Sequence, residues 1–250
     1  MTPIPAPESD SVADLQRALQ AARDELQAFT YTVSHDLRAP LRHINAFAQI
    51  IEEDWPTMPP EVAGHLATIR QSAQLLTRQL DGLTALSRLV QLPLQLALVD
   101  VAASVADAVT SLKPTAVPRP IDWQIAPELP RLWADAAMLR QVLGCVLDNA
   151  VKFTRPKDPA LIQVGGEGLP DGGGILTIAD HGVGFKPEQA SQLFKVFARL
   201  HPVREFDGLG LGLVTSRKLM ARMGGDIEIT AEPEHGCKVT LRFQAPPPVA

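Results

Sequence analysis

A heptad pattern of apolar residues near the N-terminus limits the folds open to this chain more than any other feature of its sequence. The apolar positions alternate at spacings of three and four residues, with polar residues between them, at Val12, Leu15, Leu19, Ala22, Leu26, Phe29 and Val33. This spacing predicts a long helix that packs as a coiled coil. After Val33 the spacing changes, at Leu37 and Leu41, and such a stutter locally unwinds a supercoil. Pro40 is expected to kink the helix there, because it removes a backbone hydrogen bond.

A second helical pattern follows a loop at 52–60. Its apolar stripe consists of Val62, Leu66, Ile69, Ala73, Leu76, Leu80, Leu83 and Val90. Residues 10–91 are therefore expected to form a helical hairpin with one apolar stripe on each arm. A single hairpin leaves much of this stripe in water, whereas two hairpins paired as a four-helix bundle would bury it. We therefore expect a homodimer.

From Pro93 onward the sequence mixes helix and strand patterns. Strands are expected at 96–101, 121–125, 161–164, 175–179, 227–231 and 238–243. Helices are expected at 102–112, 134–153 and 211–223. The helix 134–153 has a clear core side, made of Leu139, Val142, Leu143, Val146, Ala150 and Phe153. This part of the chain is therefore expected to be a mixed α and β domain.

The composition excludes several classes of protein. Hydrophobic residues make up 46% of the 250 residues, which is enough for a buried core and excludes wholesale disorder. The net charge of −5 argues against a nucleic-acid partner. No apolar run approaches the roughly 18 residues that span a bilayer, so we expect no membrane insertion and a cytoplasmic protein. Two cysteines, Cys145 and Cys237, are too few for a disulfide framework or a complete Cys-based zinc site.

His35 is the first candidate for chemistry. It lies beside the apolar seam and is expected to face solvent, next to Asp36. That carboxylate could accept the Nδ1 proton, fix the tautomer and leave Nε2 as a nucleophile. A lone histidine on a helix is more often an ordinary polar residue, and we interpret His43 and His65 in that way. The neighbouring acid, Pro40 and the hairpin set His35 apart.

Two further motifs lie on helices of the C-terminal part. Asn149 and Lys152 share one helix face, where an amide oxygen can coordinate Mg²⁺ and an ammonium group can meet phosphate oxygens. The glycines at 208, 210 and 212 open another helix, whose free N–H groups and dipole favour phosphate. Taken singly, both have ordinary alternatives: a solvated helix face and a loop that packs closely.

The remaining motif follows the strand 175–179. Asp180 ends this strand and is followed by Gly182 and Gly184. A carboxylate in this place suits a base with an exocyclic amine, and the glycines let the backbone approach a flat ring closely. A plain turn is the ordinary alternative.

Together, in this order and spacing, the four motifs resemble the sensor histidine kinase family over roughly residues 20–245, and the segments 29–42 and 199–208 are most similar to its phytochrome-like branch. The matching residues are His35, Asp36 and Pro40 of the phosphoacceptor box, Asn149 and Lys152 of the N box, Asp180, Gly182 and Gly184 of the first glycine box, Phe194 and Phe197 of the F box, and Gly208, Gly210 and Gly212 of the second glycine box.

This resemblance implies a multi-domain chain. An all-α hairpin at 10–92 would serve dimerisation and histidine phosphotransfer, within a dimeric four-helix bundle. An ATP-binding α/β two-layer sandwich of the GHKL (Bergerat) type would follow at 95–245, with disordered tails at 1–9 and 246–250. In that family His35 would be autophosphorylated, with Asp36 as base or orienting group. The phosphoryl group would then pass to an Asp of a response regulator receiver domain.

The same resemblance implies ATP and Mg²⁺ as cofactors. Asp180 would hold the adenine amine, Asn149 the Mg²⁺ ion and Lys152 the phosphates. The segment 185–207 would be a mobile lid anchored by Phe194 and Phe197. Arg199, on this lid, is a candidate for charge stabilisation.

Three positions depart from the family pattern. Cys145 replaces a usual polar residue four positions before Asn149 and is a poor ligand for a hard cation, so slow autophosphorylation is expected. A buried structural thiol is its expected state. Leu209 replaces a frequent Thr that can contact phosphate. Ala39 stands where many relatives carry a Thr or Asn that orients water, so weak or absent phosphatase activity is expected.

Two alternative functions remain open at this point. A degenerate kinase could act as a response-regulator-binding or phosphotransfer module, which Cys145 favours and the intact Asp180 and Asn149 disfavour. A GHKL ATPase unrelated to signalling would need a water-activating carboxylate where Cys145 stands. The sequence shows no sensor domain, so either the chain is a fragment or a separate sensor protein supplies the input.

Overall fold

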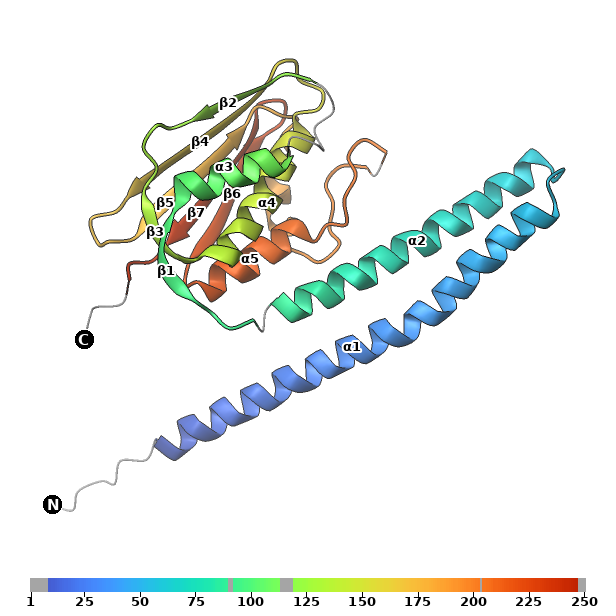
Figure 1. The fold of residues 1–250 in the computed structure, drawn as a ribbon, viewed down its shortest axis with the longest axis horizontal. Coiled ribbons are helices and arrows are strands. Elements are labelled where there is room, and N and C mark those ends of the chain that lie inside the picture. The colour runs from blue at the N-terminus through green and yellow to red at the C-terminus, as the bar shows by residue number, and fades with distance from the viewer. Residues whose placement is uncertain (1–8, 90–91, 113–118, 203, 247–250) are drawn as a thin grey trace. The chain divides into compact units, whose positions relative to one another are not determined.

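The computed structural model describes residues 9–89, 92–112, 119–202 and 204–246 (Figure 1). The chain divides into two compact units, Met1–Arg88 and Leu89–Ala250, and each is described by itself. The expected tails lie almost entirely outside the described residues, although helix α1 already begins at Ser9. Among the described residues, no helix has the length and apolar character needed to cross a membrane.

The first unit is the expected helical hairpin. Helix α1 spans Ser9–Asp54 and helix α2 spans Pro60–Leu89, and Figure 1 shows them running antiparallel. The helical conformation of α1 continues through Pro40 without interruption. A tight turn joins the two helices, and in it the Met58 N–H donates to the Trp55 carbonyl at 3.1 Å.

The interior of the hairpin is narrow. Among the described side chains of the hairpin, the buried ones are Ser34, Leu41 and Ala48 on α1, and Leu66, Ala73, Thr84 and Leu86 on α2. Two ion pairs bridge the helices, Arg38 with Asp81 at 3.0 Å and Arg70 with Glu52 at 2.5 Å. Most of the expected apolar stripe is exposed in the single chain, as predicted for a hairpin without a partner: Leu15, Leu19, Leu26, Phe29, Val33 and Leu37.

The second unit is a sheet covered on one face by helices. The larger sheet has the strand order β2-β4-β5-β7-β6, and β1 pairs with β3 in a separate two-stranded sheet. The strands are β1 Leu96–Asp100, β2 Ile121–Ile125, β3 Arg131–Asp135, β4 Ala160–Gly168, β5 Gly174–Asp180, β6 Asp226–Glu232 and β7 Gly236–Phe243. The pair β2–β4 is parallel, and the other pairs in the larger sheet are antiparallel.

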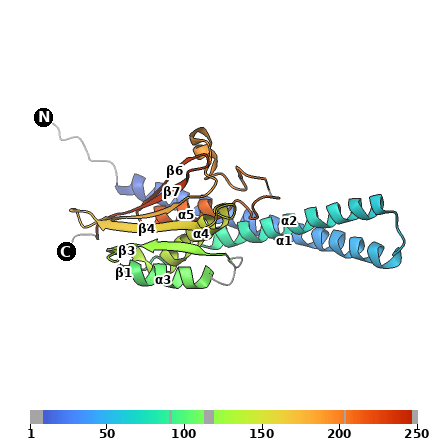
Figure 2. The ribbon, with the colours of Figure 1, turned by 90° about the horizontal axis from the view of Figure 1, so that it is seen from above.

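Three helices supply the second layer of this unit: α3 Val101–Leu112, α4 Ala136–Phe153 and α5 Gly212–Arg222. Helix α4 packs on β5, α5 packs on β6 and α3 packs on α4. Figure 2 shows this unit from a second direction, with β1, β3 and α3 along one side. The expected α/β two-layer sandwich is confirmed, and the core lies between α4 and the sheet.

Several predicted boundaries were wrong, and strand β3 was not predicted. Ala134 and Asp135 belong to strand β3 rather than to the expected helix 134–153. Asp135 ends that strand and also caps α4, because its carboxylate accepts from the N–H groups of Ala137 and Met138 at 3.0 Å. Val101 begins α3 instead of ending β1. The segment without clear signals contains a 3-10 helix, Pro187–Gln192.

Candidate functional site

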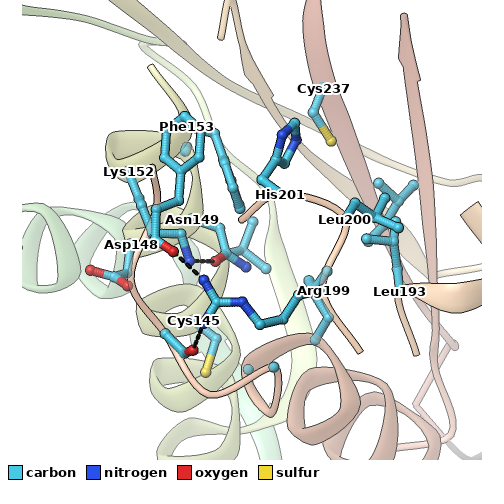
Figure 3. Close-up of a pocket in the computed structure, with 18 of the residues that line it drawn as sticks. Cys145, Asp148, Asn149, Lys152, Phe153, Leu193, Arg199, Leu200, His201 and Cys237 are labelled. Carbon is cyan, nitrogen blue, oxygen red and sulfur yellow. Dashed lines mark hydrogen bonds between the residues drawn. The ribbon is translucent and has the colours of Figure 1, made fainter. Parts of the chain in front are cut away.

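A cavity of about 250 Å³ lies in the α/β unit beside helix α4 and gathers most of the expected site residues. Those that line it are Asn149, Lys152, Asp180, Gly184, Arg199, Gly208, Gly210 and Gly212. Figure 3 shows the side chains of Asn149, Lys152 and Arg199 close together, with Phe153 and His201 nearby. Residues spread over more than 60 positions of sequence thus meet at one site.

Asp180 is the buried acid of the cavity. It is the last residue of β5, with 8% of its surface exposed. Burial raises the pKa of this carboxyl to about 6, and backbone N–H groups of Gly182 and Cys237 act in the opposite direction. The Gly182 N–H donates to Oδ1 at 2.9 Å. A carboxylate held in this way can accept a hydrogen bond from the amine of a bound base.

Two glycines, Gly184 after Asp180 and Gly210 before α5, occupy backbone positions where a side chain would not fit. Gly184 has a φ of +59°, and a Cβ there would collide with the Glu232 carbonyl. Gly210 has a φ of +71°, and a Cβ there would lie 2.6 Å from the Ala198 carbonyl oxygen. Gly182 does not line the cavity; its N–H orients Asp180 instead.

Asn149 and Lys152 lie on the last turns of α4 and touch each other. The Lys152 ammonium donates to Asn149 Oδ1 at 2.9 Å and lies 4.5 Å from the centre of the Phe153 ring. Burial lowers the pKa of Lys152, while Asp148 and Asp207 act to raise it. The described residues contain no cluster of three or more His, Cys, Asp or Glu side chains that could hold a metal. An amide oxygen such as that of Asn149 fits Mg²⁺ when phosphate oxygens supply further ligands.

Cys145 lies one turn before Asn149 and lines the same cavity. It is half-buried, its burial raises the thiol pKa, and a hydrogen bond with Ser216 acts in the opposite direction. A Cβ added at Gly212 would lie 3.8 Å from Cys145 Sγ, so the thiol sits against the start of α5. The neutral thiol therefore packs between the two helices.

The expected lid residues have different positions. Phe194 does not line the cavity; its ring packs against the core, with the Arg217 guanidinium 4.7 Å from its centre. Phe197 also lies outside the cavity lining, with a φ of +62°, and its N–H donates to the Gly210 carbonyl at 3.1 Å. Arg199 lines the cavity, and its guanidinium donates to the carbonyls of Phe206 and Gly208.

Sequence reasoning missed an aromatic cluster at this site. The rings of Phe153, His201 and Phe206 contact one another, with centre-to-centre distances of 4.9 to 5.4 Å. Beside them Arg155 pairs with Asp207 at 2.9 Å. Phe206, within the glycine-bounded segment 181–208, was the available signal, because a large aromatic side chain is stabilised by burial.

His35 lies in the hairpin unit and is exposed as expected. Its Nδ1 atom lies 3.2 Å from Asp36 Oδ1, and 68% of the imidazole surface is accessible. The ring of Tyr31 is stacked against it, with centres 6.4 Å apart. Ser34, by contrast, is fully buried inside the hairpin. His43 and His65 are also exposed, in agreement with their interpretation as solvated residues.

Comparison with known proteins gives two family matches. Residues 25–91 match the His Kinase A (phospho-acceptor) domain. Residues 134–247 match the histidine kinase-, DNA gyrase B-, and HSP90-like ATPase family. Together the two matches include His35, Asn149, Lys152 and Asp180.

Similar full-length proteins extend well beyond this chain. The phytochrome-like protein Cph1 of Synechocystis is 26% identical over 240 residues, which cover 96% of this chain and 31% of Cph1. The aerobic respiration control sensor protein ArcB of Escherichia coli is 30% identical over 241 residues, which cover 92% of this chain and 30% of ArcB. The chain thus spans about a third of the length of these relatives.

Solved structures show the same fold. ShkA, solved in complex with AMPPNP, has a TM-score of 0.60 and 27% identity, and the match covers 89% of this chain and 47% of ShkA. The Acinetobacter baumannii histidine kinase AdeS has a TM-score of 0.59 and 21% identity, with 85% and 98% of the two chains covered. The helical hairpin and the α/β sandwich are both shared features of these folds.

Proposed function

We propose that this chain, which belongs to the sensor histidine kinase family and carries a GHKL-type ATPase domain, binds ATP and transfers its γ-phosphoryl group to His35. One observation carries the proposal: a buried carboxylate, an amide oxygen, an ammonium group and two glycine turns meet in one cavity. In this proposal residues 10–92 are the dimerisation and phosphotransfer domain, and 95–245 are the ATP-binding domain.

The cavity has a polar group for each part of the nucleotide. Asp180 accepts a hydrogen bond from the adenine amine, since its ionised carboxylate is an acceptor only. Lys152 exchanges its contact with Asn149 for phosphate oxygens. The N-terminus of α5, whose first N–H groups have no side-chain cap, faces the same cavity through Gly212 and favours negative charge.

Asn149 is the residue that would hold Mg²⁺. Its Oδ1 atom already accepts from a cation, the Lys152 ammonium, at 2.9 Å. Mg²⁺ would supply neutralisation of charge on the phosphate oxygens. Release of Lys152 from Asn149 leaves both groups free for the nucleotide.

The reaction itself needs one nucleophile. His35 attacks the γ-phosphorus through Nε2; a nitrogen–phosphorus bond forms, the bond to the bridging oxygen breaks, and ADP leaves with its electron pair. Asp36, at 3.2 Å from Nδ1, keeps the proton on that nitrogen and stabilises the positive ring that forms. The ring can then pass the phosphoryl group to an Asp carboxylate of a receiver domain.

Dimerisation is part of the same proposal. The exposed stripe on α1, which includes Leu19, Leu26 and Phe29, is too large to remain in water without loss of stability. A second hairpin would cover it in a four-helix bundle.

The decisive experiment follows labelled phosphate. The chain is incubated with γ-labelled ATP and Mg²⁺, and the stability of the protein-bound label to acid and base is measured. The proposal predicts an acid-labile, base-stable label that is absent in His35→Ala and present in His65→Ala, a matched exposed histidine of the same unit. Label retained in His35→Ala, or phosphate release without labelled protein, would contradict it.

A further inference from the structure

His201 connects two walls of the nucleotide cavity. Its Nε2 atom lies 3.1 Å from the carbonyl oxygen of Gly184, within hydrogen-bond distance. Its ring lies 5.4 Å from that of Phe153, the last residue of α4, and 5.3 Å from that of Phe206. One side chain of the segment 185–207 thus touches the first glycine turn, helix α4 and the end of its own segment.

The groups that His201 contacts are themselves held in place. A Cβ at Gly184 would collide with the Glu232 carbonyl, so there is little free space beside this glycine, and the Val183 N–H donates to the Phe153 carbonyl at 3.1 Å. Phe206 is only 5% exposed, and its ring lies 4.9 Å from Phe153. The imidazole therefore links the segment to the end of helix α4, through Phe153, and to the glycine turn that follows β5.

The nearby ion pair between Arg155 and Asp207 is expected to hold the segment less firmly than His201 does. Arg155 and Asp207 form an ion pair at 2.9 Å, but their side chains are 41% and 76% exposed, and exposed pairs contribute little. Arg199 bonds to carbonyls at the end of the segment and so shapes it internally. His201 is half-buried, and it combines a polar contact with two ring contacts.

We propose that His201 is a positioning residue of the nucleotide site, which fixes the lid segment over the cavity and thereby sets the affinity for ATP. Phe153 transmits the effect, because its ring also supports the Lys152 ammonium at 4.5 Å. The part that concerns ATP rests on the proposed function, whereas the attachment of the lid does not. His201 does not take part in the transfer of the phosphoryl group.

The first test uses the full chain without nucleotide. The N–H groups of Glu205 and Phe206 both bond to the Pro202 carbonyl, at 3.1 and 3.2 Å, directly after His201. In His201→Ala their hydrogen exchange is expected to become about tenfold faster, since a hydrogen bond and two ring contacts are lost. The exposed His65→Ala variant is the control and is expected to match the parent chain. Equal exchange in the His201→Ala and parent chains would overturn the proposal.

The second test measures ATP itself with Mg²⁺, by calorimetric titration and by the kinetics of labelling at His35. His201→Ala is expected to raise Kd and KM about tenfold and to change kcat less than twofold. His201→Phe keeps the ring contacts and His201→Gln keeps a donor, so both are expected to show intermediate Kd values and to remain informative if the Ala variant fails to fold.

The outcomes separate the two proposals. A parent chain that binds no ATP would contradict the proposed function, while faster lid exchange in His201→Ala would still support the attachment. A fall in kcat with unchanged KM, or Kd values for all three variants equal to that of the parent chain, would overturn the positioning role.

Discussion

In the α/β unit, large side chains from α4 and from the sheet meet in one continuous core, and Leu139, Leu143, Ile162 and Leu241 have no exposed surface. In the hairpin unit, the buried positions on α1 are instead Ser34, Leu41 and Ala48, while larger side chains such as Phe29 are exposed. The α/β unit completes its core within one chain, whereas the hairpin exposes the apolar side chains that a partner would need. This difference agrees with their proposed roles, since a nucleotide site needs a rigid frame and a bundle needs a second copy.

The largest effect is expected from the exposed stripe of the hairpin. Replacing both Leu26 and Phe29, which are 66% and 65% exposed, with Glu should raise the dimer dissociation constant more than about 100-fold, because burial of such a side chain contributes about 1.5–3 kcal/mol. Analytical ultracentrifugation measures the constant. Gln16→Glu, an exposed polar position on the same helix, is expected to leave it unchanged. A dimer of equal affinity in the double variant would show that this stripe is not the interface.

The next effect concerns Asp180, whose ionised carboxylate is destabilised by burial in the α/β unit. Because burial raises the pKa of this folded-state carboxyl from 3.8 to about 6, the native state binds more protons than the unfolded state between these values. Stability is therefore expected to fall as the pH rises through this window, and the loss is complete above about pH 6. Asp180→Asn removes the buried charge.

At pH 7.5 Asp180→Asn should raise the free energy of unfolding of the α/β unit by about 1–3 kcal/mol and flatten its pH dependence between pH 4 and 6. The same variant should weaken ATP binding, because a charged acceptor is lost. Urea unfolding and calorimetric titration measure the two effects. Asp171→Asn, on the exposed β4–β5 turn, is the control for a loss of charge alone. A variant that is less stable at pH 7.5 would contradict the expected sign.

Many of the helices and strands could be predicted from the sequence, because local patterns of apolar residues specify them. The spacing of Leu139, Val142 and Val146 predicted the buried face of α4, and all three are buried. Strand β3 was missed because it is short and runs directly into α4, with Asp135 acting both as strand residue and as helix cap. On α1, apolar spacing could not distinguish Leu41, which packs within the hairpin, from the exposed Leu37. The two residues are four apart and therefore lie on the same side of the helix.

The site was predictable only in part for a related reason. Asp180, Asn149 and Lys152 belong to short motifs that are weak singly, and their order along the chain is what resembles a known family. The cluster of Phe153, His201 and Phe206 depends on how the segment 185–207 folds back on α4, which no local periodicity encodes. The contacts of Arg199 with backbone carbonyls have the same origin.

An effect of similar size is expected at the C-terminal end of α4, where Arg119 bonds to the last carbonyls of the helix. Its guanidinium donates to the carbonyls of Val151 and Thr154, both at 2.7 Å, and of Lys157 at 3.1 Å. Arg119→Ala removes these three hydrogen bonds and should lower the free energy of unfolding of the α/β unit by about 1–3 kcal/mol. Urea denaturation measures it, with the exposed Arg204→Ala as control. Equal stability of the two variants would contradict this capping role.

The smallest effect is expected at Cys145, and it tests whether the cavity is complete as a catalytic site. Its thiol is neutral at physiological pH, because burial raises its pKa, and a neutral thiol is a poor partner for Mg²⁺. Cys145→Asn supplies a hard oxygen one helical turn from Asn149 and should raise the rate of His35 labelling about three- to tenfold, which corresponds to roughly 1 kcal/mol. Cys145→Ala is the control, because it removes the thiol and adds no oxygen that could bind Mg²⁺. If both variants label at the rate of the parent chain, Cys145 does not limit the reaction, and the nucleotide cavity needs no further oxygen ligand at this position.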